Sequence, residues 1–230
     1  MTSSGDLLVI VPSRGRPQNI ARLLNAVHLL SRIKTHVHVA VDDDDPELES
    51  YREVMDKHGE DGDILETGPR KGLAAWTNEV AVRRAGEYSF LASFGDDHLP
   101  RTKGFDRALT RAIKDMGDTG FSYPWDGIRE DAAEAVVVSS DIVQALGWMC
   151  EPSLQHFWID NVWVDLGRGA GCIRNLRAVA VDHLHPDAGK AAQDNTYQES
   201  NKKIQQDCDA YHQWRDLRMA DDIKTVIALR

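Results

Sequence analysis

The sequence predicts an α/β protein whose central sheet is mostly parallel. Apolar runs of strand length alternate along the chain with amphipathic segments of helix length, as in repeated strand–helix units. The run Leu7–Val11 is apolar without interruption, as expected for a strand buried on both faces. Several runs stop abruptly at charged residues, which places polar side chains where open α/β sheets bind ligands, at the carboxyl ends of the strands.

The composition is that of an ordinary globular protein. The chain has 230 residues, 42% of them hydrophobic, which suits one large domain or a domain with an added arm. The net charge of -10 argues against a surface that binds polyanions as a whole and leaves room for a local basic patch. Three widely spaced cysteines and the lack of a signal-type start predict a cytoplasmic protein. The apolar runs are well short of the ~20 residues that span a bilayer, so no membrane partner is expected.

The first predicted strand leads into a loop that carries two arginines. Leu7–Val11 is followed by residues 12–17, PSRGRP, and apolar spacing then predicts a helix over Asn19–Leu30. The guanidinium groups of Arg14 and Arg16 offer planar forks of donors that suit phosphates or the edge of a nucleotide base. The alternative is that both are solvated loop arginines.

Four consecutive carboxylates follow the second predicted strand, His36–Val41. Asp42 and Asp43 are candidates for hydrogen bonds to a nucleoside, as carboxylates at strand ends are in nucleotide-binding α/β folds. Asp44 and Asp45 are expected to cap the next helix, where acidic residues favour the N-terminus. An exposed acidic turn is the alternative for the whole run.

A basic loop precedes the third predicted helix. The short strand Ile64–Thr67 runs into residues 68–72, GPRKG, and then into a helix that extends to Arg84. A helix N-terminus beside Arg70 and Lys71 suits a diphosphate, although the loop lacks Walker spacing. Asn78 lies within this helix, either on its surface or in contact with a ligand.

The run Tyr88–Phe94 predicts a buried strand that ends at Gly95-Asp96-Asp97-His98. Two adjacent carboxylates repel each other, and a divalent cation with oxygen ligands relieves the repulsion. His98 adds a nitrogen ligand that Mn²⁺ accepts. The alternative is a solvated turn, because Gly and Asp are common turn residues.

Two histidines lie on one face of a later predicted strand, Ala178–Pro186. Alternation with period two places His183 and His185 together, which makes them a candidate ligand pair. Half-exposed histidines without a ligand are the alternative. Between the two histidine-bearing segments, the pattern predicts a helix over Lys103–Met116 and further strands near residues 120–125 and 135–140.

The aromatic stretch Gln155–Leu166 contains one carboxylate between apolar neighbours, Asp160. On a helix, Trp163 and Val164 would share its face, so we expect a partly desolvated carboxylate with a raised pKa, as a general base requires. An exposed or ion-paired capping residue is the alternative. The polar stretch that follows residue 188 predicts a largely helical arm outside the core.

Together, the ordered motifs VPSRGRP, VDD, RKGLAAWTN and GDDH resemble the nucleotide-sugar-binding half of GT-A fold glycosyltransferases, of the family 2 type and of the kind found in some bacteriophages. The resemblance covers residues 7–100 well and continues more loosely through His185. It implies a Rossmann-like GT-A catalytic domain over residues 1–188, with an acceptor half over 101–188. Residues 189–230 would form the helical C-terminal arm.

The resemblance also implies roles for individual residues and a cofactor, Mn²⁺ or Mg²⁺. The candidate metal ligands are Asp97, His98, His183 and His185. Because a strict Asp-x-Asp is absent, the resemblance leaves open which of these atoms contact the metal. The candidate residues for binding the UDP- or GDP-sugar donor are Pro12, Ser13, Arg14, Arg16, Asp42, Asp43, Arg70, Lys71, Asn78 and Asp96.

The implied reaction is an inverting transfer in which Asp160 takes the proton of the acceptor hydroxyl. Among the acceptor classes of short GT-A enzymes is a hydroxymethylated pyrimidine in phage DNA. The cations that offer a phosphate-binding patch for it are Arg168, Arg174, Arg177, Lys202, Lys203, Arg215 and Arg218, and scattered solvated cations are the alternative. One alternative is a nucleotidyltransferase, although the first loop here has a single glycine. The other alternative is a nucleotide-sugar-binding protein without turnover.

Overall fold

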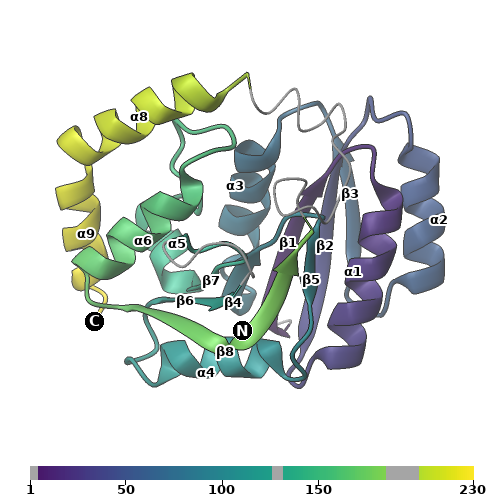
Figure 1. Cartoon of the computed structure of the whole chain (residues 1–230), viewed down its shortest axis with the longest axis horizontal. Coiled ribbons are helices and arrows are strands. Elements are labelled where there is room, and N and C mark those ends of the chain that lie inside the picture. The colour runs from purple at the N-terminus through teal and green to yellow at the C-terminus, as the bar shows by residue number, and fades with distance from the viewer. Residues whose placement is uncertain (1–4, 126–131, 185–201) are drawn as a thin grey trace.

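The computed structural model describes residues 5–125, 132–184 and 202–230. They form an α/β fold, a central β-sheet with helices on both faces (Figure 1). The elements follow in the order β1 (Gly5–Ser13), α1 (Pro17–Leu30), β2 (Thr35–Asp42), α2 (Leu48–His58), β3 (Ile64–Gly68), α3 (Leu73–Arg84), β4 (Tyr88–Ser93), β5 (His98–Pro100), α4 (Phe105–Lys114), β6 (Phe121–Trp125), β7 (Val137–Ser139), α5 (Ser140–Leu146), α6 (Ile159–Gly169), β8 (Ile173–His183), α8 (Ile204–Leu217) and α9 (Met219–Ile227).

The strand order in the sheet is β3-β2-β1-β4-β7-β6-β8-β5. The strands β3, β2, β1 and β4 run parallel, as do β6 and β8. The predicted α/β class with a mostly parallel sheet is therefore confirmed. Two strands of three residues each, β7 and β5, run antiparallel to their neighbours. An apolar run of this length carries no information about strand direction.

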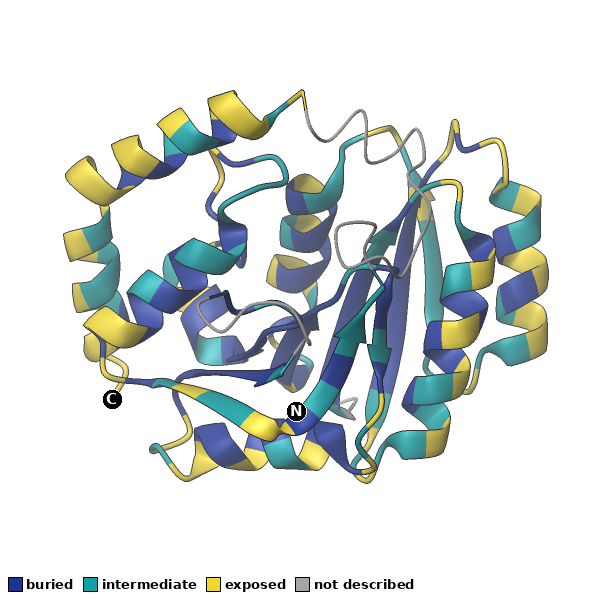
Figure 2. Ribbon diagram, viewed as in Figure 1, coloured by how far each residue is buried: buried dark blue, intermediate teal, exposed yellow. Residues whose placement is uncertain are grey.

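Alternate residues of β1 supply two separate cores. Leu7, Val9 and Val11 pack on one face with α1, α2 and α4. Leu8 and Ile10 pack on the other face with α3, α5 and α6. Since every one of these side chains has no exposed area, the uninterrupted apolar run reflects burial on both faces (Figure 2).

The long strand β8 curves across the front of the molecule and reaches the chain segment that follows β4 (Figure 1). There it pairs antiparallel with β5, with His183 directly opposite His98. His98 therefore begins a short strand, whereas the sequence indicated only a turn. The pairing brings two histidines from distant parts of the chain to one place.

The C-terminal helices contribute to the core. Trp214 of α8 and Val226 of α9 are almost fully buried in the cluster that also contains residues of α3, α5 and α6. The predicted helical arm is thus packed into the domain instead of lying outside its core. None of the helices within the described ranges combines bilayer-spanning length with an apolar sequence.

Candidate active site

A cavity of about 640 Å³ lies at the carboxyl ends of β1, β2 and β4. The starts of α3, α6 and α8 and the segment 156–158 complete its wall. Most of the residues predicted from the sequence line this cavity: Pro12, Ser13, Arg14, Arg16, Asp42, Arg70, Lys71, Asp96, Asp97, His98, Asp160 and His183.

Three predicted residues are not placed in the cavity wall. Asp43 is exposed, and His185 lies outside the described residues. The Asn78 side chain holds the segment after α5: Oδ1 accepts the backbone N–H groups of Met149 (2.8 Å) and Cys150 (2.7 Å), and Nδ2 donates to the carbonyl of Cys150 (2.7 Å). Asn78 therefore supports a loop and does not face the cavity.

Asp96 is buried and receives hydrogen bonds on both oxygens. Ser13 Oγ donates to Oδ2 (2.6 Å) and Arg16 Nη1 to Oδ1 (3.1 Å). Tyr51, which the sequence did not single out, lies 2.7 Å from Ser13 Oγ through its hydroxyl. Burial and the neighbouring Asp97 raise the pKa of Asp96 to about 6, against the opposing effect of Arg16.

Asp42 is also buried at the end of its strand and engaged on both oxygens. Oδ1 accepts the indole N–H of Trp76 (2.8 Å) and the backbone N–H of Lys71 (3.2 Å). Oδ2 accepts Arg14 Nη1 (3.2 Å), which also donates to Asp44 (2.5 Å). Asp44, expected to cap a helix, instead anchors an arginine of the cavity. Trp76 was missed because its apolar spacing in the helix indicates only a core residue.

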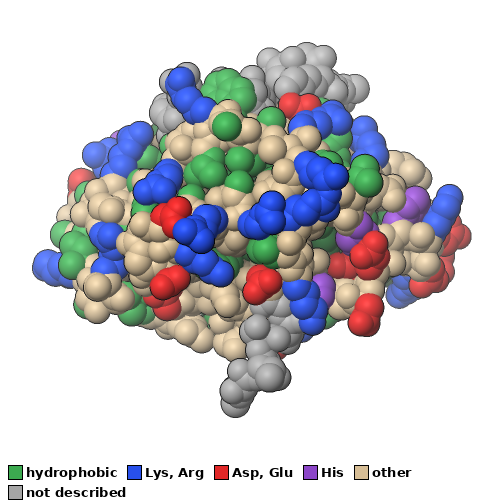
Figure 3. Space-filling view, turned by 90° about the horizontal axis from the view of Figure 1, so that it is seen from below, with side chains coloured by type: hydrophobic (Ala, Val, Ile, Leu, Met, Phe, Trp, Pro, Cys, Tyr) green, Lys and Arg blue, Asp and Glu red, His purple; other side chains and the backbone are tan. Residues whose placement is uncertain are grey.

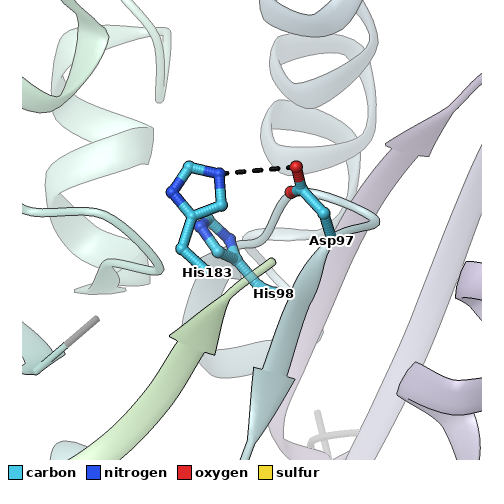
Figure 4. A group of neighbouring side chains, drawn as sticks. All are labelled: Asp97, His98 and His183. Carbon is cyan, nitrogen blue, oxygen red and sulfur yellow. Dashed lines mark ion pairs between the residues drawn. The ribbon is translucent and has the colours of Figure 1, made fainter. Parts of the chain in front are cut away.

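Asp97, His98 and His183 offer ligand atoms that all lie within 4.8 Å of one another (Figure 4). His183 Nε2 is 3.4 Å from Asp97 Oδ2. His98 Nδ1 accepts the backbone N–H of Gly95 at 2.8 Å. A Cβ atom at Gly95 would lie 2.6 Å from Asp97 Oδ1, so the glycine leaves room for the carboxylate. One carboxylate with two imidazoles is a donor set that suits Mn²⁺.

Glu134 adjoins this group, although none of the sequence motifs includes it. Its Oε2 contacts His183 Nδ1 and lies 3.7 Å from His98 Nε2. Burial opposes the charge of Glu134, but its contacts with His183 and His98 lower its pKa. Burial likewise opposes the charge of His183, but Asp97 and Glu134 raise the pKa of His183 to about 10. Glu134 lies between two alanines outside any strand, so no pattern marked it.

Asp160 lines the same cavity from the first turn of α6. The residue before the helix, Trp158, has a left-handed backbone (φ 67°) and stacks on Tyr211 with ring centroids 5.2 Å apart. A tryptophan in this backbone region is strained and persists only where its surroundings hold it. The structure thus fixes the start of α6, and with it Asp160, at the cavity wall.

A buried carboxylate of α8 holds the neighbouring part of the wall. Asp207 accepts the backbone N–H groups of Gln155 (3.0 Å), His156 (2.8 Å) and Phe157 (2.8 Å). His156 lines the cavity, and burial together with Lys203 lowers its pKa to about 4. This imidazole is therefore neutral near neutral pH.

Solved structures share the fold of this chain at low sequence identity. The crystal structure of S. aureus TarS 1-349 in complex with UDP-GlcNAc is 16% identical, with a TM-score of 0.57 over 77% of this chain and 58% of that chain. The mannosyltransferase PcManGT from Pyrobaculum calidifontis in complex with GDP-Man and Mn²⁺ is 14% identical, with a TM-score of 0.62 over 97% of this chain and 73% of that chain. The chain has the GT-A fold.

The predicted GT-A fold is therefore confirmed, while the family 2 and bacteriophage assignments remain predictions. No protein-family model and no curated protein sequence matches the chain. The chain spans 60% of the length of TarS 1-349. On this GT-A fold, the donor-binding half predicted over residues 7–100 supplies β1 to β4 and the loops that follow them.

Proposed function

We propose that the chain is a metal-dependent glycosyltransferase that moves a sugar from a UDP- or GDP-sugar to an acceptor hydroxyl. The observation that carries this proposal is the convergence of Asp97, His98 and His183 in one cavity with the cations of the loops after β1 and β3. It is also supported by the GT-A fold, since TarS was solved with UDP-GlcNAc and PcManGT with GDP-Man and Mn²⁺.

For the donor, we propose that the nucleoside lies against the end of β2 and the diphosphate against the start of α3. Arg14 is held by Asp42 and Asp44, which orients its guanidinium group at the cavity. Lys71 lies with its ammonium 4.2 Å from the Trp76 ring centroid, next to the N-terminus of α3. A helix N-terminus with adjacent cations suits phosphate oxygens.

For the metal, we propose Asp97, His98 and His183 as ligands, with His185 as a further candidate outside the described residues. A bound Mn²⁺ or Mg²⁺ would stabilise the negative charge on the departing nucleoside diphosphate. Asp96, fixed by Ser13 and Arg16, adds a buried carboxyl beside the ligands. His98 and His183 come from two paired strands, which fixes their separation, and Asp97 directly precedes the first of them.

For the base, we propose Asp160. Its carboxylate accepts the acceptor proton while the acceptor oxygen bonds to the anomeric carbon, and the bond to the diphosphate oxygen breaks with its electron pair. Because Asp160 lies in the first turn of a helix, the helix dipole favours the negative charge that a base needs. Attack from the side opposite the leaving group inverts the anomeric centre.

For the acceptor, we propose a hydroxymethylated pyrimidine in DNA as the first class to test. Despite the net charge of -10, basic side chains gather on the face shown in Figure 3. Exposed cations come from four places in the chain. They are Arg32 and Lys34 after α1, Lys103 before α4, Arg107, Arg111 and Lys114 in α4, and Arg174 and Arg177 in β8. Such a surface suits phosphodiester groups, with binding that weakens as salt increases.

Mass spectrometry of reaction products tests the proposed function. The protein is incubated with UDP- and GDP-sugars, Mn²⁺ and a panel of acceptors that includes hydroxymethylated DNA. We expect a glycosylated product and a free nucleoside diphosphate from the wild type, and neither from Asp97→Ala. Pyrophosphate release from a nucleoside triphosphate would instead identify a nucleotidyltransferase. Donor binding without turnover across the panel would identify a binding protein.

A further inference from the structure

The imidazole of His183 lies between two carboxylates, one at each ring nitrogen. Nε2 faces Asp97 Oδ2 at 3.4 Å, which is the side of the proposed metal (Figure 4). Nδ1 contacts Glu134 Oε2 on the other side. A histidine that binds a metal through one nitrogen commonly donates the proton of its other nitrogen to a carboxylate, which fixes the tautomer and the ring orientation.

We propose that Glu134 is the positioning residue of the metal site. It holds the proton of His183 on Nδ1 and so directs the Nε2 lone pair toward Asp97 and the cation. This role presupposes the cation site of the proposed function and adds to it a residue from the segment before β7. Glu134 lines the cavity, and in this role it acts through His183.

The contacts of Glu134 differ from those of carboxylates that support the backbone. Asp106 and Asp207 are buried and accept backbone N–H groups, two in the case of Asp106 and three in the case of Asp207, which braces the connections beside them. Within the described ranges, the contacts of Glu134 are with the two imidazoles. Its side chain is only 19% exposed, and this burial shields the contacts from water. A carboxylate in this position orients rings and does not hold a loop.

The hydrogen bond of His98 supports the same assignment. Gly95 N–H donates to His98 Nδ1, so a neutral His98 carries its proton on Nε2. That nitrogen is buried and lies 3.7 Å from Glu134 Oε2, farther from it than His183 Nδ1 does. To bind the cation through Nε2, His98 would release this proton, whereas Nε2 of His183 faces Asp97. Glu134 therefore acts mainly on His183.

A titration with Mn²⁺ tests this role without donor or acceptor. The EPR signal of the unbound ion measures how much Mn²⁺ the protein has bound. We expect Glu134→Ala to weaken Mn²⁺ affinity by about 10- to 100-fold, the usual effect of losing such a partner. Glu134→Gln should lose less, because its amide oxygen still accepts the Nδ1 proton. The control is Glu151→Gln: Glu151 is also buried, pairs with Arg218 and lies outside the cavity wall, so Mn²⁺ affinity should be unchanged.

Pulsed EPR of the bound Mn²⁺ adds a readout that a structural role would not change. We expect histidine nitrogen coupling in the wild type, loss of the His183 contribution in His183→Ala with the His98 contribution retained, and a weakened His183 contribution in Glu134→Ala. Wild-type affinity and coupling in both Glu134 variants would overturn the role of Glu134 and leave the proposed function intact. A wild-type protein that binds no Mn²⁺ would overturn both.

Discussion

At the residue scale, Asp42 and Asp96 are held in place before any ligand arrives. Each is less than a tenth exposed and receives donors on both oxygens from other elements. The same bonds fix Arg14 and Arg16, so each strand end presents an oriented guanidinium group together with a carboxylate. Such preorganisation lowers the entropic cost of ordering these side chains when a diphosphate binds.

Asp96→Asn should stabilise the metal-free protein at neutral pH. The pKa of Asp96 rises from 3.8 to about 6 in the folded state, because burial and Asp97 disfavour its charge. The stability that this carboxyl contributes is full below its unfolded pKa and is lost as pH rises through about 6. Measured by thermal unfolding with a chelator present, the gain in Tm from Asp96→Asn should grow between about pH 4 and pH 6 and then level off. A gain independent of pH would contradict the raised pKa.

Asp160→Asn should lower kcat by about 10²- to 10⁴-fold, the usual contribution of a general base. Donor and Mn²⁺ affinity should not change, because Asp160 is in neither the proposed donor-binding set nor the proposed metal-ligand set. The matched control is Asp165→Asn in the same helix, whose carboxylate accepts the Tyr211 hydroxyl instead of facing the cavity. Steady-state kinetics with the acceptor found by the product screen provides the measurement. Equal kcat for wild type and Asp160→Asn would exclude Asp160 as the base.

At the element scale, α8 holds a segment of the cavity wall through the side chain of Asp207. Asp207→Asn replaces one acceptor oxygen with an amide that faces backbone N–H groups. We expect a loss of about 2–3 kcal/mol in the free energy of unfolding, measured with denaturant, since hydrogen bonds to a charged group contribute about that much each. Donor affinity should fall as well, because the segment with His156 and Phe157 lines the cavity.

Asp209→Asn is the control for this effect, because Asp209 lies on the same helix and bonds only an exposed glutamine, Gln205, within the described residues. It should leave both stability and donor affinity unchanged. Comparable losses in the two variants would show that α8 contributes general helix stability and does not position the cavity wall.

The elements that the sequence predicts well are those with an unambiguous burial pattern. The strands β1, β2 and β4 follow from long apolar runs, and the amphipathic helices between them follow from apolar spacing. The strand β7 follows from the apolar run near residues 135–140, although its antiparallel direction does not. The short strand β5 was harder to predict, because three residues carry no periodicity and their partner is distant in sequence. The meeting of His98 and His183 depends on this pairing.

At the scale of the whole molecule, the cavity collects side chains from both halves of the GT-A fold. Residues directly after a predicted strand, such as Asp42 and Asp97, are predictable because parallel strands end at one edge of a sheet. Glu134 and Lys203 are not, because the chain brings them to the cavity only when the sheet and the C-terminal helices are assembled. Asn78 shows the converse, since its place in a promising motif conceals a structural role.

The central claim is that one cavity binds a divalent cation together with the diphosphate of a nucleotide sugar. Isothermal titration of UDP- and GDP-sugars into the protein, with Mn²⁺ and then with a chelator, tests it most directly. We expect one of these donors to bind at a single site in the presence of Mn²⁺, and its affinity to fall sharply with the chelator or in Asp97→Asn. Equal affinity with and without the cation, or no binding of any nucleotide sugar, would contradict the claim.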